Sequence, residues 1–286
     1  MSFLEQTSAV EIKDTRISLS EAGKGENVLF LHGNPGSRKD FSAIIEKIAD
    51  AGIKLVAPDR PGHMSSDELI DENNDPWLDA EIYAQLIDQK CGGKAWLLGY
   101  SMGAFIACKI AVKYPEKVKG VIMLAPYLMP DNPSEKPSSL PELAKGALLG
   151  TILGIILPLL SQTRMQKHIE NVFSPLAVPA DFLETWLPRY TRFETLMAMM
   201  TDKNAMLTTL KEVHEGIKSL ECPVVALIGD KDMVCSAEAQ KKLIADTIPG
   251  AQIRILQDAG HSIPVTHAEN CLVLIKEAIA SSAAGS

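Results

Sequence analysis

The chain has 286 residues, 46% of them hydrophobic, which is enough to bury a sizeable core in one large domain or in a domain with an insertion. Its formal net charge of −8 argues against nucleic acid and anionic membrane surfaces as partners, because both are themselves negatively charged. The five cysteines lie far apart without metal-ligand spacing, so we expect free thiols in a reducing compartment and no metal site.

The N-terminal residues are acidic and polar where a secretory signal peptide needs a basic end and an apolar run, so we expect a cytoplasmic protein. After them, strand and helix patterns alternate. An antiparallel pair is predicted at 10–19, and further strands at 27–31, 54–57, 95–98, 120–124, 224–228 and 252–256. Helices are predicted at 41–48, 77–87, 105–114, 237–244 and after 266. This order predicts an α/β fold with a mostly parallel sheet, helices on both faces, and ligands bound beyond the carboxyl ends of the strands.

The strand at 95–98 runs into Gly-Tyr-Ser-Met-Gly at 99–103, and a helical pattern opens directly after it. A strand that becomes a helix so abruptly crowds its neighbours, and the two glycines remove side chains at that point. Such a turn exposes the hydroxyl of its central serine in a strained backbone conformation. We interpret Ser101 as a candidate nucleophile; because an ordinary turn with a capping serine has the same spacing, other parts of the chain must supply its partners.

A serine hydroxyl needs a general base within hydrogen-bonding reach. Of the six histidines, His261 is the best placed, since it follows the last predicted strand in a short loop at the carboxyl edge of the sheet. The base needs a carboxylate that fixes its tautomer. Asp232 is favoured because it gives the order Ser, Asp, His along the chain, whereas Asp131 remains the rival acid. Asp230, in the tight turn, is expected to cap backbone N–H groups.

Negative charge that develops on a substrate carbonyl oxygen needs hydrogen-bond donors that are already in place. One predicted donor is the backbone N–H of Met102, directly after the nucleophile and at the start of a helix. The second is expected in the His-Gly-Asn-Pro-Gly turn at 32–36, which follows the third predicted strand. We assign it to the backbone N–H of Asn34, because proline cannot donate and the glycines let the backbone approach closely.

Taken together, the motifs at 32–36, 59–63, 99–103, 229–232 and 258–261 resemble those of the α/β-hydrolase superfamily. The resemblance covers nearly the whole chain. It implies an eight-stranded, mostly parallel sheet built from 1–126 and 215–286, with a helical cap inserted at 127–214, and a triad of Ser101, His261 and Asp232. The His-Gly-Asn-Pro motif is similar to the corresponding motif of haloalkane dehalogenases and epoxide hydrolases. Those enzymes use an aspartate nucleophile, so the serine in this chain favours acyl transfer over their reactions.

The predicted cap should hold the determinants of specificity. The apolar segment at 143–160 has an uncharged run shorter than the roughly 20 residues that a membrane-spanning helix needs. We interpret it as a helix that lines the substrate pocket through Leu153 and Ile156. Interfacial membrane contact and a dimer contact are the alternatives, the latter because glycines recur every four residues. Met197 and Met200 belong to a second helical stripe, which is expected to pack on the core and can also line an adaptable pocket.

These inferences predict a serine hydrolase that cleaves a carboxylic ester, or a related acyl compound, with an apolar acyl or ring group. We expect no metal, no organic cofactor and no integral membrane segment, and a monomer or homodimer. Hydrolysis of a carbon–carbon bond, a thioester or a lactone by the same residues is the closest alternative. A noncatalytic binder of a small apolar ligand is the alternative from another class, which the complete set of triad positions disfavours.

Overall fold

The computed structural model describes residues 7–48, 51–69, 75–130, 132 and 134–283. One eight-stranded sheet forms its centre, in the order β1-β2-β4-β3-β5-β6-β7-β8. Strand β2 pairs antiparallel with β1 and β4, and all other pairings are parallel. The predicted sheet is therefore confirmed. The strands are β1 (Thr7–Ile12), β2 (Thr15–Gly23), β3 (Glu26–Leu31), β4 (Ile53–Pro58), β5 (Ala95–Tyr100), β6 (Val118–Leu124), β7 (Val224–Gly229) and β8 (Gln252–Leu256).

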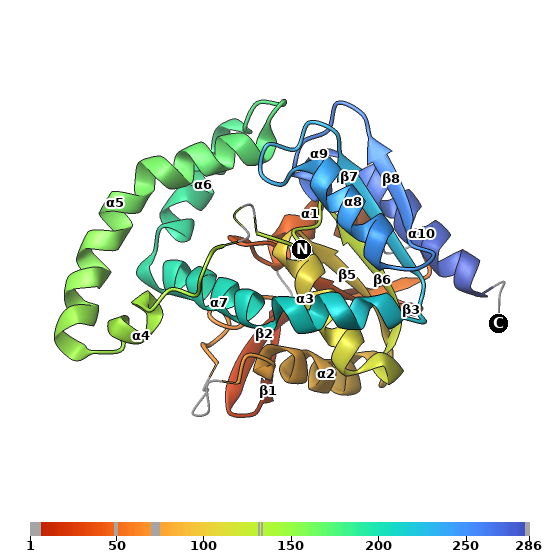
Figure 1. Cartoon of the computed structure of the whole chain (residues 1–286), viewed down its shortest axis with the longest axis horizontal. Coiled ribbons are helices and arrows are strands. Elements are labelled where there is room, and N and C mark those ends of the chain that lie inside the picture. The colour runs from red at the N-terminus through yellow and green to blue at the C-terminus, as the bar shows by residue number, and fades with distance from the viewer. Residues whose placement is uncertain (1–6, 49–50, 70–74, 131, 133, 284–286) are drawn as a thin grey trace.

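Two hydrophobic clusters cover the two faces of this sheet (Figure 1). Successive strand residues point to opposite faces, so Leu97 joins one cluster while Trp96 and Leu98 join the other. Each fully buried side chain of this kind contributes roughly 1.5–3 kcal/mol, so the central strands hold the carboxyl edge of the sheet firmly. One face carries α2 (Leu78–Cys91), α3 (Met102–Lys113) and α8 (Ala237–Thr247), and the other carries α1 (Ser42–Ile48) and α10 (Ala268–Ala283). The short helices are η2 (Arg38–Phe41), η3 (Pro115–Lys117), η4 (Ile217–Ser219) and α9 (Ile263–Thr266).

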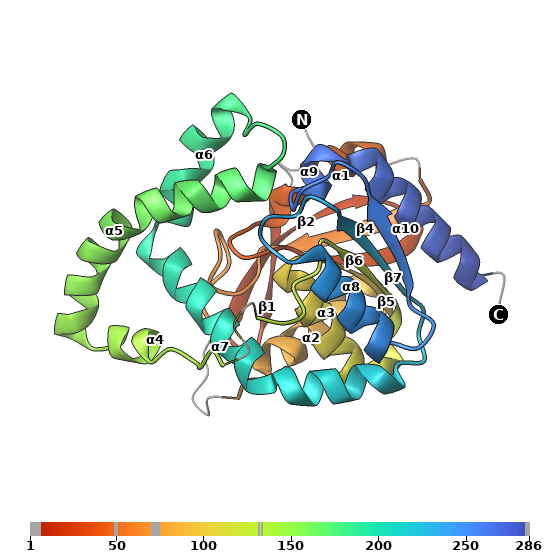
Figure 2. The ribbon, with the colours of Figure 1, turned by 45° about the horizontal axis from the view of Figure 1, so that its top comes forward.

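The insertion between β6 and β7 contains α4 (Leu140–Ala144), α5 (Ala147–Phe173), α6 (Ala180–Tyr190) and α7 (Phe193–Gly216). Helices α5, α6 and the start of α7 share a separate cluster that includes Met165, Phe173 and Tyr190. Figures 1 and 2 show α4, α5 and α6 reaching out to one side of the sheet. The second half of α7 packs differently, because Met206 and Val213 belong to the cluster on the sheet. Helix α7 thus packs with the cap at its start and on the sheet in its second half.

Helix α5 is unusual in length and composition. Within the described part of the chain it is the helix long and apolar enough to cross a membrane, judged by those two properties alone. Its C-terminal third is anchored in the cap through buried Met165, Ile169 and Phe173. Its first half is largely uncovered by the rest of the protein, as Leu148, 79% exposed, illustrates.

Candidate active site

Ser101 occupies the turn between β5 and α3, where strand gives way to helix within one residue. Its φ of +53° and ψ of −120° form a combination that L residues rarely adopt, so the surrounding packing must impose it. The glycines of the motif make this packing possible. A Cβ on Gly103 would overlap the carbonyl of Leu31, and a Cβ on Gly99 would overlap the first turn of α3. The local sequence therefore specifies a tight elbow with serine at its apex.

His261 links Ser101 to a carboxylate through two hydrogen bonds. Its Nε2 lies 2.9 Å from Oγ of Ser101, and its Nδ1 lies 2.6 Å from Oδ2 of Asp232. Nδ1 must carry the hydrogen to donate to the carboxylate, so Nε2 of the neutral ring accepts the serine hydroxyl hydrogen. The three side chains follow β5, β7 and β8, whose carboxyl ends share one edge of the sheet. The structure brings together the three residues predicted for a triad, in the order that proton transfer requires.

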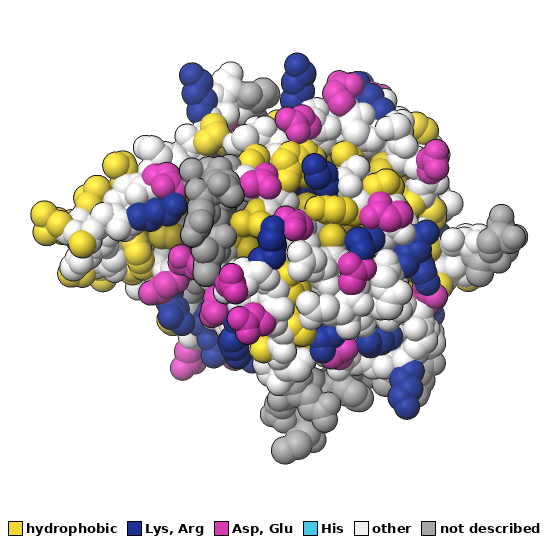
Figure 3. Space-filling view, turned by 90° about the horizontal axis from the view of Figure 1, so that it is seen from below, with side chains coloured by type: hydrophobic (Ala, Val, Ile, Leu, Met, Phe, Trp, Pro, Cys, Tyr) yellow, Lys and Arg dark blue, Asp and Glu magenta, His cyan; other side chains and the backbone are white. Residues whose placement is uncertain are grey.

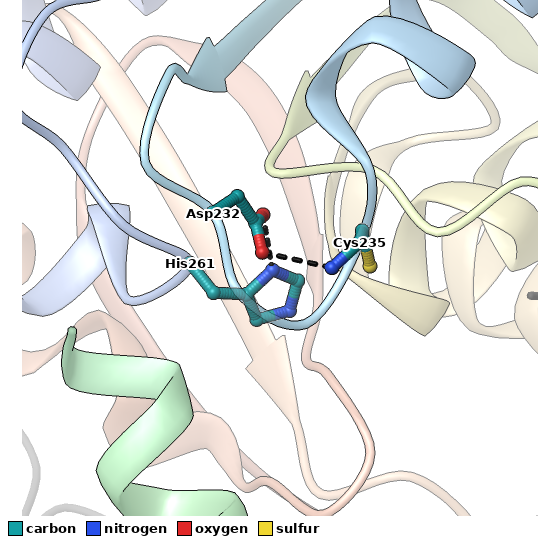
Figure 4. A group of neighbouring side chains, drawn as sticks. All are labelled: Asp232, Cys235 and His261. Atoms are coloured by element: carbon teal, nitrogen blue, oxygen red, sulfur yellow. Dashed lines mark hydrogen bonds and ion pairs between the residues drawn. The ribbon is translucent and has the colours of Figure 1, made fainter.

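Both oxygens of the Asp232 carboxylate have hydrogen-bond partners, one set from its own loop after β7 and one from the loop after β8. Oδ1 accepts the backbone N–H groups of Val234 and Cys235, each at 2.8 Å, while Oδ2 faces His261 (Figure 4). Within the described residues, Asp232, Cys235 and His261 also form the group whose donor atoms are close enough to share a metal ion. Both oxygens of Asp232 accept hydrogen bonds from the chain. The arrangement of these three residues therefore serves to orient the imidazole of His261.

The other two candidate acids differ in position. Oδ1 of Asp230 accepts the backbone N–H of Ala259 at 3.3 Å, which joins the loop after β7 to the loop that carries His261. Asp230 therefore caps a backbone N–H group, as its place in the tight turn predicts. Asp131, the rival to Asp232, lies outside the described residues.

The turn after β3 packs directly against Ser101. A Cβ on Gly33 would lie 3.2 Å from the Cβ of Ser101, closer than ordinary packing allows. The next residue, Asn34, lines the same cavity as Ser101, and its side-chain amide donates to the carbonyl of Met199 on α7 at 3.1 Å. Met102 is the first residue of α3, so its N–H has no partner within the helix and lies at the positive end of the helix dipole. Both predicted oxyanion donors thus belong to backbone segments that adjoin Ser101.

A cavity of about 270 Å³ lies beside Ser101 and His261. Its cap side is aliphatic and aromatic, while the residues from the turn after β3 and from η2 supply polar groups. The cap contributes one polar residue, His168, and six apolar or aromatic ones to the lining: Ile169, Val172, Phe173, Phe182, Trp186 and Tyr190. Lys39 and Asp40 belong to the polar part. A ligand in this cavity would meet an apolar wall opposite the serine.

Burial keeps two titratable groups of the cavity wall uncharged at neutral pH. It raises the pKa of Asp40 to about 8, and this effect outweighs the hydrogen bond from the N–H of Ser37, which favours the charged form. Burial also lowers the pKa of His168 to about 4, and the nearby His261 acts in the same direction. Among the lining residues that the structure describes, Lys39 is therefore the one permanent cation, and its side chain is exposed.

A family model described as alpha/beta hydrolase fold matches residues 26–268. The chain belongs to this family. The match runs from the start of β3 to the start of α10, so it includes the turn after β3, the elbow, and the loops after β7 and β8. The fold predicted from the sequence is thereby confirmed.

Curated relatives of this α/β-hydrolase match over a shorter segment. The chain is 32% identical over 118 residues to the 2-hydroxy-6-oxo-6-phenylhexa-2,4-dienoate hydrolase of Burkholderia cepacia, covering 40% of this chain and 41% of that protein. The matched segment thus spans about two fifths of the relative's own length.

Solved structures extend the likeness of fold to the whole chain. The haloalkane dehalogenase DatA of Agrobacterium tumefaciens C58 superposes with a TM-score of 0.73 at 17% identity, covering 97% of both chains. A thermophilic esterase of Thermogutta terrifontis gives a TM-score of 0.71 at 20% identity, covering 97% of this chain and 99% of the esterase. At these identities the likeness concerns the fold alone.

The hydrolase also holds a buried polar network that the sequence did not predict. Arg60, 1% exposed at its side chain, donates to the carboxylate of Asp202 at 2.7 Å and to the carbonyl of Gly33 at 2.9 Å. Nε2 of His63 donates to the same carboxylate at 2.8 Å, and Nε2 of His32 accepts the backbone N–H of Arg60 at 2.8 Å. Since Asp202 lies on α7, the network ties the cap to the turn beside Ser101. The motif at 59–63 was visible in the sequence, but its distant partner on α7 was not.

Electrostatics explains how this network stays charge-balanced. Burial lowers the pKa of His32 and of His63, and the neighbouring Arg60 charge adds to both effects, so the two rings are neutral. Burial acting alone would raise the pKa of Asp202. The attraction of Arg60, together with the hydrogen bonds from Arg60 and His63, outweighs it and lowers that pKa. The network therefore contains one buried ion pair, between Arg60 and Asp202, with neutral imidazoles around it.

The four residues predicted to line the pocket do not line this cavity. Met197 is buried in the cap cluster, and Met200 packs at the edge of that cluster. Leu153 is only partly buried and Ile156 is 43% exposed, because both lie on the uncovered half of α5. The cap side of the wall comes instead from the C-terminal third of the same helix and from α6. The residues of α5 that line the cavity follow the uncharged run at 146–163, so the apolar run by itself does not locate the pocket.

Proposed function

We propose that this protein is a serine hydrolase that cleaves a neutral carboxylic ester with an apolar acyl or ring group. The observation that carries the proposal is the hydrogen-bonded series from Ser101 through His261 to Asp232, next to a mainly apolar cavity. A hydroxyl is a weak nucleophile at neutral pH, and a neutral imidazole within hydrogen-bonding distance is the feature that activates it.

The reaction follows from these positions. As Oγ of Ser101 attacks the ester carbonyl carbon, its proton passes to Nε2 of His261, and Asp232 stabilises the imidazolium that forms. The backbone N–H groups of Met102 and Asn34 would bind the resulting oxyanion. When the intermediate collapses, His261 returns the proton to the leaving alkoxide and an acyl-enzyme remains. A water molecule then gives its proton to His261 and attacks the acyl carbon, which releases the carboxylic acid and restores Ser101.

Hydrolysis of a carbon–carbon bond is the second candidate, favoured by the dienoate hydrolase that matches part of the chain. The name of that relative specifies a carboxylate substrate. In this chain the cavity wall offers Lys39 as its one permanent cation among the described lining residues, and burial keeps His168 neutral. Burying a carboxylate without a partner costs several kcal/mol, so the wall supports a neutral ester better than a dienoate.

Active-site labelling tests the nucleophile. A fluorophosphonate should label the wild-type protein, and the Ser101→Ala and His261→Ala variants should show almost no labelling. Both substitutions should lower kcat for p-nitrophenyl esters about 10⁴-fold or more while the fold persists. Undiminished ester hydrolysis by Ser101→Ala would contradict the mechanism, and an unlabelled wild-type protein would favour a noncatalytic binder.

Substrate comparison tests the bond that is cleaved. We expect kcat/KM to rise from acetyl to butyryl and octanoyl esters, because the longer acyl groups bury more area against the aromatic wall. The matched comparison is 2-hydroxy-6-oxo-6-phenylhexa-2,4-dienoate under the same conditions. A higher kcat/KM for this compound than for every ester would replace the ester proposal with carbon–carbon hydrolysis.

A further inference from the structure

The first half of α5 carries apolar side chains that the rest of the molecule leaves uncovered. No charged residue occurs between positions 146 and 163. In this stretch Leu148 is 79% exposed, Leu160 73%, Leu159 68% and Ile155 64%. Soluble proteins seldom expose a contiguous aliphatic surface of this kind unless it contacts a partner or a membrane.

These side chains form one continuous surface, which we name the α5 stripe: Leu148, Ile152, Ile155, Ile156, Leu159 and Leu160. Spacings of three and four residues place them on the same side of the helix. Figure 3 shows hydrophobic side chains gathered at the far tip of the molecule, where Figures 1 and 2 place the first half of α5. The stripe therefore lies on a protruding edge and not in a groove.

We propose that the α5 stripe docks onto the surface of a lipid bilayer, with the helix lying in the plane of the interface. Exposed Lys145 precedes the stripe, and exposed Arg164 and Lys167 follow it, so long cationic side chains can reach the headgroups at both ends. Acids lie in the same flanks: Glu142 pairs with Lys145 at 2.8 Å, and Glu170 is exposed. Because the two acids offset most of the charge of the three cations and the chain carries a net charge of −8, the surface that fits is a zwitterionic one held by apolar contact.

A second copy of the chain fits the stripe less well. Tight helix pairs approach through small residues, but the glycines of α5 face their own molecule. A Cβ on Gly150 would overlap the carbonyl of Ala144, and a Cβ on Gly154 would lie 3.8 Å from the ring of Phe193. The outward face is bulky and lacks the flanking charges that set the pairing of coiled coils, and the stripe covers fewer than two heptads.

A membrane-spanning orientation is disfavoured by the C-terminal third of the same helix. There Met165, Ile169 and Phe173 are buried against the rest of the cap. The helix can therefore lie on a bilayer while its end stays packed in the protein.

Helix α5 leads from the stripe to the cavity. The stripe ends at Leu160, and Ile169, Val172 and Phe173 further along the helix line the cavity beside Ser101. An apolar ester dissolved in the bilayer would thus reach the serine along one continuous helix. This delivery rests on the proposed function, whereas the docking does not.

Vesicle flotation tests the docking. The full chain should float with phosphatidylcholine vesicles and remain bound at high salt, because apolar contact is not screened. Ile155→Glu and Leu159→Glu should each lower the bound fraction about tenfold, since a charge then enters the acyl region. Both positions are more than half exposed, so the fold is preserved, and circular dichroism checks this. Val273→Glu on α10, at a position 50% exposed, is the matched control and should bind like the wild type.

Three outcomes would overturn the docking. The first is a wild-type protein that does not float, and the second is Glu variants that float as well as the wild type. The third is a dimer by light scattering that Leu159→Glu dissociates, because a second copy would then cover the stripe. The Ser101→Ala variant should float normally. An unlabelled wild-type serine together with normal flotation would reject the hydrolase proposal alone and leave the docking intact.

Discussion

Replacing Asp202 with alanine should lower both the stability and the turnover of this hydrolase. Asp202 is the one cap carboxylate that the described structure pairs with Arg60, whose side chain is 1% exposed. Its removal leaves a buried guanidinium without a charged partner, held by the carbonyl of Gly33 and by its contact with the ring of His32, and takes the hydrogen-bond acceptor away from His63. Breaking a buried pair in this way costs about 3–5 kcal/mol of the free energy of unfolding.

The chain offers a closely matched control. Lys109 and Asp79 form a second buried pair at 2.5 Å, with side-chain exposures of 1% and 16%, against 1% and 18% for Arg60 and Asp202. Asp79→Ala should therefore destabilise the protein by a similar amount. This pair lies between α2 and α3 and does not contact the turn at Gly33, so turnover should change less than about twofold.

Turnover should separate the two variants. Gly33 packs against Ser101, so loss of the Arg60 anchor should shift the turn that carries Asn34, and a shift of about 1 Å costs up to about 100-fold in kcat. We expect Asp202→Ala to lower kcat for an ester about 10- to 100-fold, measured where urea titration shows both variants folded. Asp202→Asn, which keeps one acceptor oxygen, should fall between Asp202→Ala and the wild type. Equal kcat values for Asp202→Ala and Asp79→Ala would refute the reasoning.

Three further predictions concern the relay and the cavity. Asp232→Asn should lower kcat about 10⁴-fold with an unchanged circular dichroism spectrum, because an amide can hold His261 in the wrong tautomer; a loss below tenfold would contradict the assigned acid. Asp40 has its pKa raised to about 8 in the fold, so the folded state retains a proton that the unfolded chain gives up above about pH 4. The free energy of unfolding should thus fall by roughly 1.4 kcal/mol per pH unit from about pH 5 to pH 8 relative to Asp40→Asn, and a pH-independent difference in urea titrations would reject this. Trp186→Ala should lower kcat/KM for octanoyl esters about tenfold and leave acetyl esters nearly unchanged, whereas an equal loss on both would place Trp186 outside the acyl site.

The elements that the sequence predicted are those with a local cause. The elbow is encoded in consecutive residues, because glycines at 99 and 103 are needed where β5, β3 and α3 approach one another. His261 and Asp232 were found by position, since residues that follow neighbouring parallel strands meet at one edge of the sheet. The end of one strand differs from the prediction. The strand predicted at 95–98 continues to Tyr100, because Gly99 and Tyr100 still pair with β6.

The features that were missed depend on contacts between distant segments. Arg60 and His63 stood in a visible motif, but the partner that makes them a network, Asp202, lies in a helix whose other residues suggested only packing. The polar pattern of α7 does not distinguish a solvated aspartate from a buried one. Only the folded cap, which turns that face of α7 toward the loop after β4, creates the ion pair and with it the need for a carboxylate at this position.

Helix α5 shows why composition alone could not assign the pocket. Its first half is uniformly apolar and its last third mixes apolar with polar residues, yet Ile155 in the first half is 64% exposed while Ile169 in the last third is 2% exposed. The difference arises because α7 meets the first half of α5 only on the side of Gly154 and Leu157, which leaves Ile155 uncovered, whereas the last third packs into the cap cluster. If burial in the protein core were the reason for the whole apolar run, the uncovered half would carry polar residues on its outer face, as amphipathic helices do. Its uniform apolar character fits the docking proposed above, in which a lipid surface supplies an apolar environment outside the protein.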